Sequence, residues 1–112
     1  MQLESLNRVE LKGRIGAVKV IRLSETSMAR LSVATNYAYK GSDGCAVIET
    51  TWHTVVVWEG KGVSRETIES IAKGDAVHVI GRIRLQKYTD SDGVEKTVPE
   101  IVAHKLEKMS TE

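Results

Sequence analysis

The sequence is poor in aromatic, cysteine and proline residues. Its 112 residues contain no phenylalanine, one cysteine and one proline. The single Cys45 excludes an intrachain disulfide framework and is typical of a reducing compartment. No apolar run is long enough to cross a bilayer, so no membrane association is expected. Residues 1–5 have neither a basic region nor an apolar run, so no signal peptide is expected. The expected location is cytoplasmic.

Net charge of either sign is also almost absent. Sixteen Lys and Arg residues face fifteen Asp and Glu residues, which leaves a formal charge of +1. Bulk electrostatics therefore indicate no partner, and any basic surface must be local. The length suits one domain.

The five aromatic residues that are present all fall in the middle of the chain. They are Tyr37, Tyr39, Trp52, Trp58 and Tyr88, and they alternate with Thr, Asn, Gln, Arg and Lys. Flat rings beside cations suit unstacked nucleobases, because each base offers a π-face and each phosphate a negative charge. Position alone leaves open that the tryptophans are core residues.

Alternating polarity predicts long strands. From Arg8 the apolar residues fall on odd positions, and beyond Gly16 they move to even positions, Val18 and Val20. A parity change across a glycine predicts a bulge or a sharp bend. Further strands are expected over 30–39, 45–58, 75–88 and 95–103, with a hairpin turn at 41–44. Pro99 cannot donate to a ladder, so the last strand is expected to lie at an edge or to carry a bulge.

One helix is expected, over 64–73. Ser64 can cap its first turn, Val63 and Ile68 have the spacing of a hydrophobic staple, and Lys73-Gly74 is a stop signal. The order is therefore three strands, a helix and two strands. This order predicts an all-β fold with one short helix, the five-stranded Greek-key barrel called the OB-fold, which binds oligonucleotides and oligosaccharides.

With these elements placed, short motifs along nearly the whole chain resemble bacterial-type single-stranded DNA-binding proteins. The most specific combination is Trp52-His53 followed by a valine run, together with the later Gly-Arg and Tyr-Thr-Asp motifs. The matching segments are Asn7-Arg8-Val9, Leu31-Ser32-Val33-Ala34-Thr35-Asn36, Thr51-Trp52-His53-Thr54-Val55-Val56-Val57-Trp58, Lys73-Gly74-Asp75, Gly81-Arg82 and Tyr88-Thr89-Asp90.

The resemblance implies sequence-independent binding and protection of single-stranded DNA in replication, recombination or repair, by a nucleoid-associated homotetramer. It implies base stacking on Tyr39, Trp52, Trp58 and Tyr88, which are expected on one strand and its neighbours in the barrel. The expected phosphate contacts are Lys12, Arg14, Arg82, Arg84 and Lys87, and Arg82, Arg84, Gln86 and Tyr88 alternate onto one strand face. His53 is implied to lie at a subunit interface.

The expected domain boundaries are 1–106 for the OB-fold DNA-binding domain and 107–112 for a short polar tail. Members of the family usually continue into a flexible linker and an acidic tip that recruits repair and replication proteins. This sequence ends at Ser110-Thr111-Glu112. Partner recruitment through such a tip is therefore doubtful.

No enzyme activity, metal or cofactor is expected. His53 could be a base or a ligand on its chemistry alone, but no Ser/Asp or Cys/His group with recognisable spacing accompanies it. Cys45, His78 and His104 lack zinc-ligand spacing. Residues 90–93 resemble the start of a calcium loop, but Tyr88 and Pro99 would occupy ligand positions, so a hairpin turn explains them better.

Two other functions fit the same fold. One is a dimeric adaptor like the primosomal replication protein N, which is also short and lacks the tail. The other is an oligosaccharide-binding or purely structural barrel, because a fold alone does not determine its ligand. Sugar sites also use tryptophan platforms but need no aligned cations.

Overall fold

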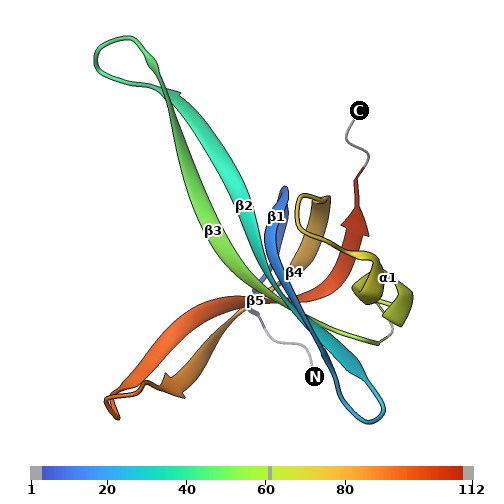
Figure 1. The fold of residues 1–112 in the computed structure, drawn as a ribbon. Coiled ribbons are helices and arrows are strands. Elements are labelled where there is room, and N and C mark those ends of the chain that lie inside the picture. The colour runs from blue at the N-terminus through green and yellow to red at the C-terminus, as the bar shows by residue number, and fades with distance from the viewer. Residues whose placement is uncertain (1–3, 61, 110–112) are drawn as a thin grey trace.

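The structure, a computed structural model, describes residues 4–60 and 62–109. Five long strands close into a barrel in the spatial order β1-β2-β3-β5-β4, and one short helix lies beside it (Figure 1). The all-β OB-fold expectation is therefore confirmed. The elements are β1 (Val9–Arg22), β2 (Ser27–Lys40), β3 (Ala46–Trp58), α1 (Arg65–Ser70), β4 (Ala76–Thr89) and β5 (Glu95–Lys108). Among the described residues, no helix has the length and apolar character needed to cross a membrane.

The core comes from the alternating strand positions. Leu31, Val33, Val55 and Val57 are each at most 1% exposed, and Ile68 of α1 joins them from outside the sheet. Because side chains of a strand alternate between its faces, one parity of each strand fills the barrel and the other faces outward. Each fully buried aliphatic side chain stabilises the fold by about 1.5–3 kcal/mol.

The first strand changes partners where the sequence predicts a bend. Residues 9–14 of β1 pair with β4, and residues 14–22 pair with β2. The register with β2 shifts between Ile15 and Ala17, so Gly16 sits at the irregularity. The predicted bulge is confirmed, and it lets one strand close the barrel by bonding to neighbours on both sides.

Two hairpins extend beyond the barrel as arms (Figure 1). The β2–β3 arm continues to the Lys40–Ala46 pair, and the β4–β5 arm continues to the Thr89–Glu95 pair. Between the arms, β3 and β5 run parallel and pair only over Val55–Val57 with Ile101–Ala103, and they diverge on the N-terminal side of these residues. Pro99 lies outside this parallel pairing, which agrees with the expected edge position.

Three predicted boundaries are wrong by three residues or more, and the first is the start of the second strand, which lies at Ser27 and not at 30. The helix ends at Ser70 and not at 73, because Ile71 is extended and the Asp75 carboxylate accepts a hydrogen bond of 2.8 Å from the Ala72 N–H. Its start is confirmed, since the Ser64 side chain accepts from the Thr67 N–H. The last strand runs to Lys108 and not to 103, because residues 105–108 pair with β4 and Leu106 is buried. Of the expected tail at 107–112, residues 107 and 108 lie in β5, and 110–112 lie outside the described residues.

Candidate nucleic-acid interface

Trp52 is an exposed ring held in a defined pose. The register aligns Arg14 of β1, Ala34 of β2 and Trp52 of β3 in one row across three strands. Ala34 is too small to obstruct the indole, whose six-membered ring reaches β1 and packs against Gly16. A Cβ atom placed on Gly16 would lie 2.6 Å from the Trp52 Cη2 atom. Since the side chain is nevertheless 61% exposed, the indole offers a platform to a flat ligand.

A surface hollow brings this ring together with two of the predicted phosphate contacts. Trp52, Lys12 and Arg14 all line it, together with Gly13, Ala34, Asn36, Ala76 and Met109. Arg14 is held in place by a hydrogen bond of 3.0 Å from Nη1 to the Gly74 carbonyl oxygen. The hollow therefore combines a stacking surface with two cations.

Trp58 lies on the same face of β3 as Trp52. The two residues are six positions apart, about 20 Å along an extended strand. Trp58 is 42% exposed, so neither tryptophan belongs to the core, and the alternative of core tryptophans is wrong. We call this face of the β2–β3 hairpin, with the adjoining outward face of β4 and β5, the outer face.

The two arginines predicted as phosphate contacts on β4 share the outer face, but among the described residues only one of them forms an ion pair within the protein. Arg82 is exposed, whereas the Arg84 Nη2 atom lies 2.6 Å from the Oε1 atom of Glu100, a carboxylate that is almost completely buried. Arg84 therefore carries a charge that is partly balanced by the protein. Lys87 alternates onto the opposite face and forms a loose ion pair with Glu95, at 3.8 Å.

The two tyrosines predicted to stack on bases, Tyr39 and Tyr88, lie far out on different arms. Tyr39 is opposite Val47 on the β2–β3 arm, and Tyr88 is opposite Lys96 on the β4–β5 arm. The expectation that Tyr88 comes from a neighbour of β3 is wrong, because β5 lies between β3 and β4. Tyr39 also falls on the opposite side of its ribbon from Trp52. The four predicted rings thus form a central pair and two outlying members.

His53 points away from the tryptophans. It is half-buried, and its Nε2 atom lies 2.8 Å from the Thr35 hydroxyl oxygen. It lines the cleft where β3 and β5 diverge, alongside Ile83, Pro99 and Ile101. Ile83 is 47% exposed there, next to the polar Thr51 and Thr54, so the cleft presents both apolar and polar surface to solvent.

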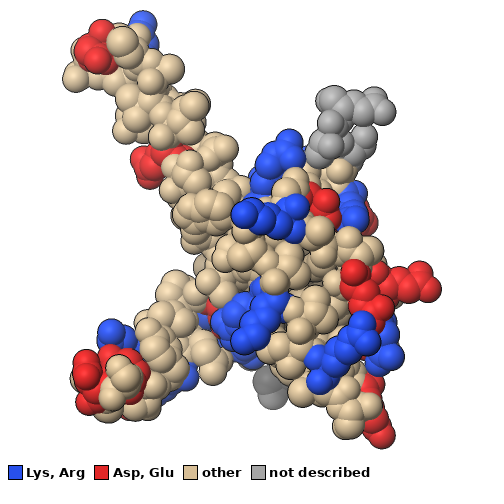
Figure 2. Space-filling view, in the orientation of Figure 1, with Lys and Arg blue, Asp and Glu red and all other residues tan. Residues whose placement is uncertain are grey.

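Basic side chains gather over the barrel body, while much of the visible β2–β3 arm carries no charge (Figure 2). Lys12 is not alone on β1, because Glu10 lies beside it and is 2.6 Å from the His78 Nε2 atom. That hydrogen bond from His78 holds the pKa of Glu10 below its usual value. Among the residues that the structure describes, no group of three or more His, Cys, Asp or Glu could hold a metal ion.

Some residues at this interface were not identified from the sequence. Tyr37 is 69% exposed, and its ring centroid lies 6.1 Å from that of Tyr39. Its alternation with Tyr39 was a visible signal. Met109 lines the hollow beside Trp52 and comes from the end of the chain, so no local pattern indicated it. Arg30 forms an ion pair with Glu100. Its alternation with core residues of β2 indicates that it faces outward, but its partner depends on the register between strands.

Comparison with known proteins agrees with this arrangement. The model of the single-strand binding protein family matches residues 6–109. The single-stranded DNA-binding protein of Xanthomonas axonopodis pv. citri is 37% identical over 106 residues, which are 93% of this chain and 58% of that protein. The mitochondrial single-stranded DNA-binding protein of Drosophila melanogaster is 37% identical over 102 residues, 89% of this chain and 68% of that protein. The chain spans about three fifths of the length of the bacterial relatives it matches first.

A solved structure extends the likeness to three dimensions. Plasmodium falciparum SSB, in a complex with ssDNA, superposes with a TM-score of 0.79 at 24% identity, over 98% of this chain and all of that one. At that identity the match supports the fold alone. The family match covers nearly the whole chain and includes all five strands and the helix. The chain therefore belongs to the single-strand binding protein family.

Proposed function

We propose that this chain binds single-stranded DNA without sequence preference and protects it during replication, recombination or repair. The observation that carries the proposal is the hollow in which the exposed Trp52 ring meets Lys12 and Arg14. Stacking is tolerant of sequence because every base has a π-face, and cations that bind phosphate read no base.

The DNA strand crosses the outer face from Trp52 toward Trp58. Arg82 and Arg84 supply phosphate contacts beside this path. Tyr39 and Tyr88, both 44% exposed, extend the stacking surface onto the two arms. Lys87 contributes from the β4–β5 arm. Because the rings are distributed over two arms, a DNA strand must wrap around the domain to reach all of them.

The assembly we propose is a homotetramer whose contacts include the cleft lined by His53. Ile83 and Leu85 on the β4–β5 arm are 47% and 66% exposed in the single chain. Association of subunits would bury this apolar surface. A dimer in solution would favour the adaptor role instead. Binding to DNA also accounts for the expected nucleoid-associated location.

The test is a fluorescence titration with poly(dT), repeated with mixed-sequence oligonucleotides, with poly(rU) and at several salt concentrations. Tryptophan emission should be quenched on binding, and the logarithm of affinity should fall linearly with that of salt, by about 0.7 per phosphate contacted. Similar affinities for the DNA sequences would support sequence independence, and tighter binding of poly(rU) would redirect the proposal to RNA. A salt-independent affinity would remove the electrostatic part of the proposal, whereas a strong salt dependence would exclude a sugar-binding barrel.

A further inference from the structure

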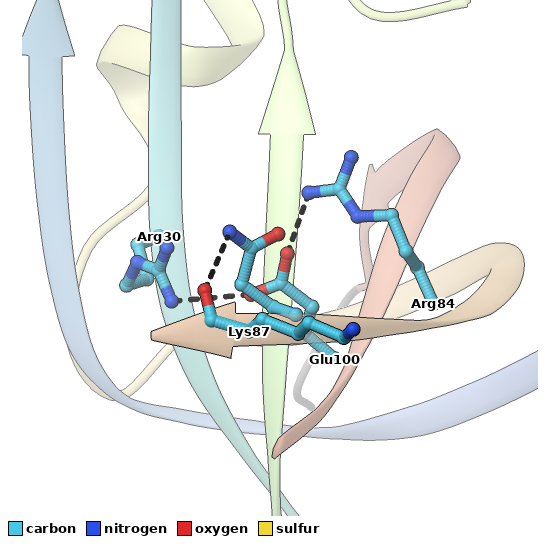
Figure 3. A network of polar contacts seen from close by, with 5 residues as sticks. Arg30, Arg84, Lys87 and Glu100 are labelled. Atoms are coloured by element: carbon cyan, nitrogen blue, oxygen red, sulfur yellow. Dashed lines mark hydrogen bonds and ion pairs between the residues drawn. The ribbon is translucent and has the colours of Figure 1, made fainter. Parts of the chain in front are cut away.

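A buried carboxylate lies at the centre of the outer face. The Glu100 side chain is 1% exposed and contacts two arginines from different strands (Figure 3). Arg30 Nη1 of β2 is 3.3 Å from Oε2, and Arg84 Nη2 of β4 is 2.6 Å from Oε1. A buried charge is costly unless it is paired, so Glu100 constrains both guanidinium groups.

The two arginines are brought together only through Glu100. Strands β2 and β4 are not neighbours, because β3 and β5 lie between them in the barrel. Yet the Arg30 and Arg84 side chains remain 47% and 39% exposed. One arginine would neutralise one carboxylate, so the group carries a surplus positive charge at the surface.

One of the two arginines, Arg30, lies level with the stretch of β3 between the two tryptophans. In the β2–β3 register, Arg30 is opposite Val56, which lies between Trp52 and Trp58 along the outer face. A DNA strand whose bases stack on Trp52 and Trp58 would therefore carry its phosphates over Arg30. A guanidinium has five N–H donors, and among the described residues Arg30 uses one bond to Glu100, which leaves donors for a phosphate oxygen.

We propose that Glu100 is a positioning residue that holds Arg30 and Arg84 together as a phosphate clamp between Trp52 and Trp58, and that Arg30 is a further phosphate contact. The proposal rests on the proposed DNA binding. It differs from a purely structural ion pair because it gives Glu100 an effect on binding through two residues at the surface.

The first experiment replaces Arg30 by Gln, which keeps an N–H donor for Glu100 and removes the charge. Arg30→Gln should lower the salt slope for poly(dT) by about 0.7, so that between 50 and 200 mM salt its affinity falls about 2.6-fold less than that of the wild type. The matched control is Arg22→Gln, since Arg22 forms an exposed ion pair with Glu69 at 3.0 Å near the β1–β2 turn. The control should keep the wild-type slope.

The second experiment examines Glu100 itself. Glu100→Gln removes one negative charge from the site, so affinity at low salt would rise if Glu100 only competed with phosphate. Positioning requires the opposite, a weaker affinity in a variant whose thermal melt is still cooperative. If that variant does not fold, a double-mutant cycle on Arg30→Gln and Arg84→Gln replaces it. Coupling through Glu100 requires losses that are less than additive, because losing either arginine leaves the other fully paired with the carboxylate.

A wild-type slope and affinity in Arg30→Gln would overturn Arg30 as a phosphate contact. A rise in affinity in Glu100→Gln, or strict additivity in the cycle, would overturn the positioning role. Both results are distinct from failure of the proposed function, in which the wild-type protein itself would not bind poly(dT).

Discussion

The indole of Trp52 packs against Gly16, although their strands are separated by β2. Residue 16 can receive the ring only because it lacks a side chain, and the intervening Ala34 is small enough to let the ring pass. The same glycine sits at the bulge that turns β1 from one barrel partner to the other. One position thus serves both barrel closure and the orientation of the platform.

Gly16→Ala should displace the Trp52 ring and weaken binding of poly(dT), by no more than the roughly 1–3 kcal/mol that a lost stacking partner costs. Quenching of tryptophan emission should shrink in parallel. The matched control is Gly60→Ala, since a Cβ there meets no atom within 4 Å. Equal binding by both alanine variants would show that the pose of Trp52 does not depend on Gly16.

A substitution in the cleft tests the assembly. His53→Lys places a long cation in the cleft, where the imidazole contacts Thr35, and burying that charge in a subunit contact is unfavourable. Light scattering should show a shift from tetramer to smaller species, and DNA affinity should fall indirectly. His104→Lys, at an exposed position of β5, is the control and should keep the wild-type mass. A monomeric wild type at micromolar concentration would contradict the proposed interface.

Features that depend on neighbouring residues could be predicted from the sequence. The bulge at Gly16 follows from a parity change within one strand, and the helix start follows from the hydroxyl of Ser64 and its spacing to Thr67. The early helix end could not be predicted, because it depends on the Asp75 carboxylate folding back onto the Ala72 N–H.

Relationships between strands were less accessible. Tyr88 was assigned to a neighbour of β3, but the parallel pairing of β5 with β3 separates β3 from β4. The Arg30–Glu100–Arg84 group joins residues up to 70 positions apart. Only the register of a closed barrel brings such positions together, and alternation within each strand says nothing about register between strands.

Acid should destabilise the protein partly through the turn between β4 and β5. Asp90 Oδ1 accepts hydrogen bonds of 3.0 Å from the Val94 and Asp92 N–H groups, and Lys96 lies 3.2 Å from Oδ2. These contacts, the bond from Val94 first, hold the pKa of Asp90 below its ordinary value of 3.8. The unfolded chain therefore binds more protons between the lowered pKa and 3.8, so this stabilisation is complete above 3.8 and is lost as pH falls through the lowered pKa.

The measurement is the melting temperature as a function of pH from neutral into the acid range. Asp90→Asn should show a shallower fall in acid than the wild type, because it removes the titrating group. Asp92→Asn is the control, since no hydrogen bond or ion pair involves its carboxylate among the described residues. Identical acid profiles for Asp90→Asn and the wild type would show that the turn does not contribute.

The last prediction separates stacking from packing at the two tryptophans. Trp52→Ala and Trp58→Ala should each weaken poly(dT) binding by about 1–3 kcal/mol per stacked base. Their free energies of unfolding should fall by less than the roughly 3–5 kcal/mol typical of a core ring, because the side chains are 61% and 42% exposed. Trp52→Phe and Trp58→Phe keep a flat ring and should recover much of the affinity. A Trp52→Ala protein that melts early yet binds poly(dT) at full strength would show that the indole supports β1 and does not stack on bases.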